Sequence, residues 1–275
     1  MGVTLLSPAL FAWVAFDPAD HASTSALDRC SLAMVVARRS RCPSSLWKAN
    51  ASIALLEAHD TSAPLIYFNA GANKGFAVAE FLQRFHDDGG NAPSNAAWFK
   101  AVRAIKPSGM FSCGMCGACK DPLPPPEERH NRSVRVFAFE LLKSNAWLLG
   151  KLFQRHRVPG RALNVAVGNY TGTAWAPTGV RTGQEWSSAE LGVGAGGGKL
   201  TPVPSITVDA FSQSEGLHVI DWLSIDAEGW DALVLQGGRS MLSQRRIHLL
   251  EFVCATLTHS LARSLVLTES YVLAD

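Results

Sequence analysis

The sequence of 275 residues has no long run of lysine and arginine, and its formal net charge at pH 7 is only +2. Nucleic-acid-binding proteins usually carry a concentrated basic stretch, so we expect no nucleic-acid partner. The chain also lacks an uninterrupted apolar stretch of about 20 residues, which a membrane-spanning helix requires. Its apolar N-terminus, MGVTLLSPALFAWVAF, has no basic flank and contains Pro8. No clear membrane span is therefore expected, and the compartment stays open.

Cysteine is sparse, but three of the six cysteines are closely spaced. They lie in the segment CGMCGAC and are Cys113, Cys116 and Cys119. Three thiolates at this spacing could bind zinc, which prefers four ligands, and Cys30, Cys42 or His130 could supply the fourth. A disulfide with Cys30 or Cys42 in an oxidising compartment, or three free thiols, would be equally compatible with this spacing. All three alternatives remain open.

From residue 64 onward, short apolar segments typical of buried strands alternate with amphipathic segments typical of helices. The expected strands are residues 64–71, 134–140, 161–169, 205–211, 219–229 with its following loop, and 246–253. The expected helices are residues 76–85, 145–156 and 230–242. This alternation predicts an α/β fold in which a mostly parallel, doubly wound sheet carries helices on both faces.

The main α/β domain is expected to span residues 64–275, after an N-terminal extension, residues 1–63, with one helix near residues 45–59. Two long segments interrupt the alternation. Residues 86–133, which include the cysteine cluster, are far longer than a usual connection and are interpreted as an insertion. Residues 179–204 are rich in glycine, serine and proline and are predicted to form a long flexible loop.

The segment YFNAGANKGF, residues 67–76, breaks from an apolar strand into a glycine-containing turn. Gly71 and Gly75 would let a ligand approach the backbone closely, and the following helix offers its N-terminal N–H groups. A tight turn without a ligand is the alternative. Glu140 ends the next strand, where a carboxylate can accept hydrogen bonds from two ribose hydroxyls. A solvated carboxylate at a strand end is the alternative for Glu140.

Three further carboxylates lie at or near the carboxyl ends of later strands. Asp226 and Glu228 belong to LSIDAEGWD, in which Gly229 permits a turn into the next helix. Carboxylates at this place are costly unless they are paired or face a site, and capping of the next helix is the alternative. Glu251 lies in the apolar segment LLEFV and indicates either the edge of an active site or a structural salt bridge.

Four ordered blocks resemble the FkbM family of S-adenosylmethionine-dependent methyltransferases, over roughly residues 64–253. YFNAGANKG is similar to a strand, Asp, small residue, Gly-Ala-Asn-x-Gly pattern, with Asn69 in place of the usual Asp. VFAFELLKSNAWLL resembles a strand ending in Phe-Glu, and LNVAVGNYTGTAWA resembles the Asn-x-Ala-Val-Gly block. The most specific block is VIDWLSIDAEGWDALVLQGG, similar to Ile-Asp-x-Glu-Gly followed by Val-Leu-x-Gly, with Ser224 where many relatives have Lys.

The resemblance implies a class I methyltransferase fold, S-adenosylmethionine as cofactor, and methyl transfer to an oxygen of a small-molecule or glycan acceptor. The residues it implies for cofactor binding are Asn69, Gly71, Asn73, Gly75, Glu140, Asn164 and Ala166. It makes Asp226 and Glu228 candidates for acceptor binding or for the base that removes the acceptor's proton. The insertion and the Gly-rich loop are expected to surround the acceptor pocket.

Two other classes of function use similar residues. A nicotinamide-dependent oxidoreductase would have a comparable turn but normally shows G-x-G-x-x-G, which AGANKG does not fit. A catalytically degenerate cofactor-binding protein is compatible with every motif described above.

The class I methyltransferase sheet usually ends with a helix and two more strands after its fifth strand. Residues 254–275 are too few for all three elements, and they predict one helix, residues 257–267, and at most one short strand, residues 270–273. We therefore expect an incomplete C-terminal end of the sheet, whose exposed edge favours self-association. Coverage of this edge by the N-terminal extension, residues 1–63, is the alternative.

Overall fold

The computed structural model describes residues 52, 55–56, 62–86, 92–106, 124–184, 199–255 and 266–272. Within these residues the main sheet has six strands in the order β3-β2-β1-β7-β8-β9. Their bounds are Gly160–Leu163 for β3, Val134–Phe139 for β2, Leu65–Ala70 for β1, Ile220–Ile225 for β7, Ile247–Ala255 for β8 and Val266–Val272 for β9. Neighbouring strands are parallel except β9, which pairs antiparallel with β8. The predicted α/β fold with a mostly parallel sheet is confirmed.

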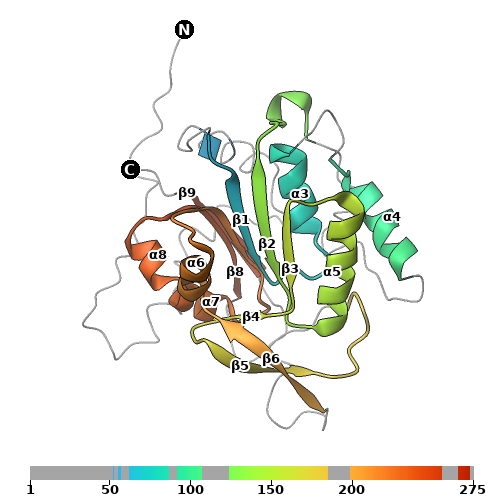
Figure 1. Ribbon diagram of the computed structural model, residues 1–275, viewed down its shortest axis with the longest axis vertical. Helices are drawn as coiled ribbons and strands as arrows, with labels where there is room; N and C mark the ends of the chain where they lie inside the picture. Colours follow the sequence, from blue (N-terminus) through green and yellow to red (C-terminus); the bar gives the residue numbers. More distant parts are fainter. Residues whose placement is uncertain are drawn as a thin grey trace.

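Helices cover both faces of this sheet (Figure 1). On one face lie α3 (Phe76–Phe85), α4 (Asn95–Ile105) and α5 (Lys143–His156), which pack a core that includes Phe81, Trp98 and Leu149. On the other face lie α6 (Val208–Glu215), α7 (Asp231–Gly237) and α8 (Arg239–Ser243). Because both faces are covered, every residue of β1 and β7 is buried, as expected for central parallel strands.

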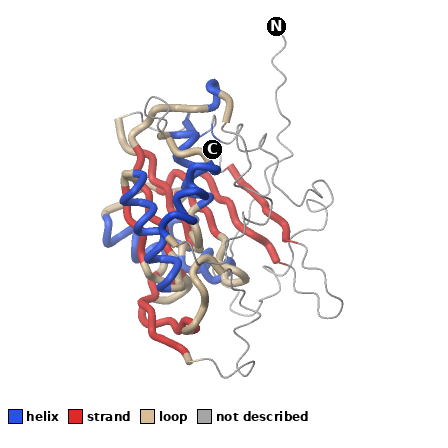
Figure 2. The backbone as a smooth tube through the Cα atoms, turned by 90° about the vertical axis from the view of Figure 1, so that its right-hand side faces the viewer, coloured by secondary structure: helices blue, strands red, loops and turns tan. Residues whose placement is uncertain are grey.

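A second, small sheet lies beyond the carboxyl ends of the first strands of the main sheet (Figure 1 and Figure 2). It contains β4 (Ala166–Val167), β5 (Gly172–Pro177) and β6 (Leu200–Ile206), in the order β4-β6-β5. The single strand expected over residues 161–169 is therefore wrong, because its two halves belong to different sheets. Residues 200–204, expected in the flexible loop 179–204, are also part of strand β6.

Two predicted elements differ from the structure around α6 and α7. The strand expected over residues 205–211 is wrong after Ile206, because Thr207 caps α6 by accepting a hydrogen bond from the Ala210 N–H (3.0 Å). A capped first turn with Asp209 near the helix N-terminus favours helix over strand. The helix expected over residues 230–242 is broken near Gly238 into α7 and α8.

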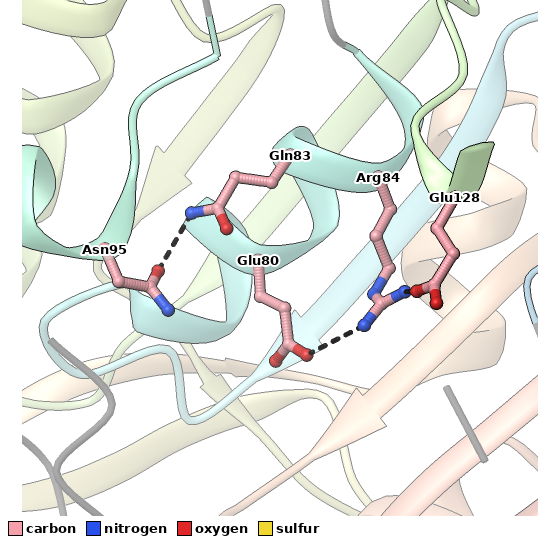
Figure 3. Close-up of polar contacts among 5 residues, drawn as sticks. All are labelled: Glu80, Gln83, Arg84, Asn95 and Glu128. Carbon is pink, nitrogen blue, oxygen red and sulfur yellow. Dashed lines mark hydrogen bonds and ion pairs between the residues drawn. The ribbon is translucent and has the colours of Figure 1, made fainter. Parts of the chain in front are cut away.

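The insertion is fastened to α3 (Figure 3). Gln83 on α3 donates to the Asn95 side chain at the start of α4 (3.0 Å). The buried Arg84 side chain forms an ion pair with Glu128 (2.8 Å), in the short 3₁₀ helix Pro126–Glu128, and a longer one with Glu80 (3.9 Å). The described parts of residues 86–133 therefore pack on the domain.

The two ends of the chain are described only in part. Ser52, Leu55 and Leu56 are helical, and Leu55 belongs to the same core cluster as Trp98. Val266 and Leu267, expected to end a helix, are instead the first residues of β9. Within the described residues, β8 is followed by this one strand. None of the helices in the described ranges is long and apolar enough to cross a membrane.

Candidate functional site

The carboxyl ends of β1, β2 and β7 meet at the turn that follows β1. The Gly71 N–H donates to the Phe139 carbonyl oxygen at the end of β2 (3.0 Å), and the Asp226 N–H donates to the Ala70 carbonyl oxygen (2.9 Å). Gly71 has a φ of +86°, and a Cβ atom at this residue would lie 1.9 Å from the Asp226 carbonyl oxygen. Both the backbone conformation and the close approach of the loop after β7 therefore require glycine.

The far end of this turn packs against two helices. Gly75 has a φ of +79°, and a Cβ atom there would lie 2.7 Å from Leu149 on α5 and 2.8 Å from Trp98 on α4. The Trp98 indole N–H also donates to the Lys74 carbonyl oxygen (2.8 Å). The insertion thus supports the turn through Trp98. Sequence reasoning missed this residue, because no motif connects it to the turn.

Glu140 follows β2 directly and is only 6% exposed. Its two carboxylate oxygens accept hydrogen bonds from the Asn73 and Leu142 backbone N–H groups, both at 2.8 Å. Burial raises the pKa of Glu140 to about 6, the two backbone hydrogen bonds and Lys74 oppose this rise, and the charge of Glu228 adds to it. Each oxygen keeps another lone pair, so the carboxylate can still accept hydrogen bonds from ligand hydroxyls.

Asn164 and Ala166 follow β3. The Asn164 side chain donates to the carbonyl oxygens of Glu140 (3.0 Å) and Leu141 (2.9 Å). It therefore orients the backbone that carries the Glu140 carboxylate. Ala166 begins β4 and pairs with Ser205 of β6, so it belongs to the small sheet.

A short segment, residues 181–184, is hydrogen-bonded to a side chain of the turn, Lys74, and to a side chain of α5, Asn145. The buried Lys74 ammonium donates to the Gly183 carbonyl oxygen (3.0 Å). Asn145 accepts a hydrogen bond from the Gly183 N–H (2.7 Å) and donates to the Gln184 carbonyl oxygen (3.2 Å). This part of the expected Gly-rich loop therefore lies beside the candidate site.

Asp226 and Glu228 are both exposed in the loop after β7. The loop is held by Asp231, whose carboxylate accepts hydrogen bonds from the backbone N–H groups of Ala227 (3.4 Å) and Gly229 (3.1 Å). Asp231 is buried at the start of α7, and sequence reasoning missed its role, although a carboxylate in the first turn of a helix is a known signal. The structure thus brings Asp226 and Glu228 to the same edge as Glu140.

Asn69 lies one residue before the end of β1 and is 1% exposed. It is the parallel-strand neighbour of Ser224 on β7, whose backbone carbonyl oxygen accepts a long hydrogen bond from the Asn69 side chain (3.5 Å). Asn69 therefore lies on β1 just before the turn, and its side chain is directed toward β7.

The candidate zinc ligands Cys113, Cys116 and Cys119 lie outside the described residues. Among the residues that the structure describes, no group of three or more His, Cys, Asp or Glu side chains could hold a metal ion.

The edge therefore combines a turn free of side chains at its glycines, a buried carboxylate that can accept hydroxyl hydrogen bonds, and two exposed carboxylates. The model of the methyltransferase FkbM domain matches residues 116–261 of the chain. No curated protein and no solved structure matches it. The match covers more than half of the 275 residues and includes β2, β7 and β8. The chain belongs to the FkbM methyltransferase family.

Proposed function

We propose that the protein is an S-adenosylmethionine-dependent methyltransferase that methylates a hydroxyl oxygen of a small molecule or sugar. The observation that carries this proposal is the arrangement of Glu140. Its carboxylate lies at the carboxyl edge of a doubly wound sheet and is held in place by the turn at Gly71–Gly75, through the Asn73 N–H. In such sheets this is the edge at which nucleotide-like ligands bind.

The residues at this edge fit the cofactor. Glu140 can accept hydrogen bonds from the two ribose hydroxyls, and Asn164 orients the backbone that carries it. The Asp226 backbone packs against Gly71 where a Cβ atom would lie, so the glycine fixes the path of the turn beside Glu140. On this proposal, Gly71, Asn73 and Gly75 lie along the amino-acid portion of the cofactor.

When bound, S-adenosylmethionine supplies a methyl group already activated by its sulfonium. The protein must then hold the acceptor oxygen in line with the S–CH₃ bond and remove the hydroxyl proton as the C–O bond forms. Asp226 and Glu228 are exposed at the required edge, so either carboxylate can orient the acceptor hydroxyl or take its proton.

Calorimetric titration with S-adenosylhomocysteine tests the proposal. We expect Glu140→Ala to weaken binding at least about 10-fold, because a hydrogen bond to a charged group contributes about 1.5–3 kcal/mol. Glu215→Ala is the matched control, since Glu215 forms ion pairs with Arg135 and Arg161 away from this edge. Equal affinity in the parent protein and Glu140→Ala would refute the ribose assignment, and tighter binding of NAD would refute the proposed class of enzyme.

A further inference from the structure

A chain of hydrogen bonds connects Glu140 with residues 181–184, which we call the anchored segment. The Glu140 carboxylate accepts a hydrogen bond from the Asn73 N–H (2.8 Å), and the Asn73 side-chain oxygen accepts a long one from the Asn145 amide (3.4 Å). The Asn145 amide also accepts from and donates to the backbone of the anchored segment (2.7 and 3.2 Å). The proposed ribose ligand and the anchored segment are therefore connected through only two residues, Asn73 and Asn145.

Two buried side chains hold the anchored segment at Gly183. Lys74 is 2% exposed and donates to the Gly183 carbonyl oxygen, and Asn145 is 1% exposed and accepts a hydrogen bond from the Gly183 N–H. Opening of the anchored segment would take these hydrogen bonds from two buried polar side chains, which costs free energy. The closed position of the segment is therefore the favoured one.

The same two side chains influence Glu140. The positive charge of Lys74 opposes the rise that burial causes in the pKa of Glu140, and so favours the ionised carboxylate, which accepts hydrogen bonds. Asn145 contacts the side chain of Asn73, whose backbone has a φ of +45° and must be held in this uncommon conformation by its surroundings. In that conformation Asn73 directs its N–H to the Glu140 carboxylate. The closed segment and a Glu140 carboxylate prepared for a ligand thus depend on the same two side chains, so each stabilises the other.

We propose that Lys74 and Asn145 are positioning residues that couple the closed position of the anchored segment to binding of the cofactor at Glu140. This inference rests on the proposed function. Neither side chain has to touch the cofactor, because Lys74 acts on Glu140 through its charge and Asn145 acts through Asn73. Such coupling is reciprocal: the factor by which closure strengthens cofactor binding equals the factor by which the cofactor favours closure.

Trypsin can report whether the anchored segment is open. It cleaves after arginine, and Arg181 is exposed at the start of the segment. The protease binds its substrate in an extended form, whereas Gly183 is buried and the Gln184 N–H closes a turn onto the Arg181 carbonyl oxygen (3.0 Å). Cleavage between Arg181 and Thr182 therefore requires opening, and its rate follows the open population. We expect saturating S-adenosylhomocysteine to slow this cleavage about 5-fold or more in the parent protein.

Asn145→Ala and Lys74→Met each remove part of the coupling. Both should speed cleavage after Arg181 without ligand and reduce the protection that S-adenosylhomocysteine gives. In calorimetric titrations both should bind S-adenosylhomocysteine about 3-fold or more weakly, by a factor no larger than the protection measured in the parent protein. Gln154→Ala and Lys151→Met are the matched controls, because they make the same kinds of change at exposed side chains of α5. They should leave affinity and protection unchanged.

Mass spectrometry of the fragments follows cleavage at this bond, and thermal unfolding identifies a variant that does not fold. Since Lys74 and Asn145 lie on different elements, one folded variant is enough for the test. The inference is overturned if S-adenosylhomocysteine binds the parent protein without slowing cleavage after Arg181, or if the folded variant binds more weakly with its protection intact. Failure of the parent protein to bind S-adenosylhomocysteine would instead overturn the proposed function and this inference with it.

Discussion

At the residue scale, Glu140 couples folding to pH. Burial disfavours its charged form, so its pKa rises from 4.5 to about 6. The native state therefore holds this proton more tightly than the unfolded state, and the group contributes stability at low pH that is lost as pH rises from 4.5 through 6. The expected loss is about 2 kcal/mol.

Urea unfolding between pH 4 and 7.5 checks this expectation. Glu140→Ala lacks the titrating group. The unfolding free energy of the parent protein minus that of the variant should therefore fall by about 2 kcal/mol as pH rises. Parallel pH profiles for the two proteins would show that Glu140 ionises at its ordinary pKa.

Asp226 and Glu228 are expected to act in turnover more than in cofactor binding, because both are exposed where an acceptor would approach. Asp226→Asn and Glu228→Gln keep the size of each side chain and remove its basicity. At least one of them should lower methyl transfer about 100-fold or more while changing S-adenosylhomocysteine affinity less than about threefold. The assay uses isotopically labelled S-adenosylmethionine and a metabolite extract, followed by mass spectrometry. Full activity in both variants would leave these carboxylates without a catalytic role.

Alanine substitutions at Gly71 and Gly179 can separate two effects on the free energy of unfolding. One is the strain of an alanine in the left-handed backbone region, and the other is a steric clash of its Cβ atom. Both glycines have similar φ values, +86° and +82°, but a Cβ at Gly179 would meet nothing within 4 Å, whereas one at Gly71 would meet the Asp226 backbone. We expect Gly179→Ala to cost about 1–2 kcal/mol and Gly71→Ala about 2–5 kcal/mol. Thermal unfolding measures both, and equal losses would mean that the loop after β7 moves aside without cost.

At the scale of elements, the insertion supports the candidate site through Trp98. Its side chain is completely buried, packs beside Gly75 and donates to the Lys74 carbonyl oxygen. Trp98→Ala should cost about 3–5 kcal/mol, whereas Trp147→Ala on α5, whose side chain is 48% exposed, should cost less than about 0.5 kcal/mol. Chemical denaturation checks both values. Similar small losses would show that α4 contributes little to the fold around the turn.

Strong apolar patterns predicted β1, β2, β7 and β8 of the main sheet well. Residues 76–85 form a helix as expected, because an apolar stripe at helical spacing follows a glycine turn. The carboxyl-edge residues Gly71, Glu140, Asp226 and Glu228 could be placed together because parallel strands share one edge. No sequence rule predicts that Trp98 or residues 181–184 lie beside the site, because their positions depend on tertiary contacts between residues far apart in the sequence.

The small sheet was missed because its strands have weak local signals. β6, LTPVPSI, contains two prolines, which normally argue against a strand. β4 pairs only with Ser205 and Ile206, so most of β6 has a strand partner on one side only. Proline is tolerated at such edges, and pairing with β5 then decides the conformation of the segment.

At the scale of the whole molecule, β9 is the outermost strand of the main sheet in the described part of the chain. An edge strand presents backbone N–H and C=O groups that can pair with another chain. We therefore predict concentration-dependent self-association through β9. Sedimentation velocity over a 10-fold or larger range of protein concentration should show an increasing average mass.

Two single proline substitutions test whether this edge is responsible. Leu267 and Thr268 are adjacent in β9, and neighbouring residues of an antiparallel strand direct their N–H groups to opposite sides. One of Leu267→Pro and Thr268→Pro therefore removes a bond to β8 and lowers the unfolding temperature, whereas the other removes an outward N–H and leaves stability nearly unchanged. The variant of normal stability should associate less than the parent protein. Trp175→Ser serves as the comparison, because Trp175 is 56% exposed on β5, outside the main sheet. Loss of association in Trp175→Ser alone would assign the contact to the small sheet, and a parent protein that stays monomeric at every concentration would contradict the prediction.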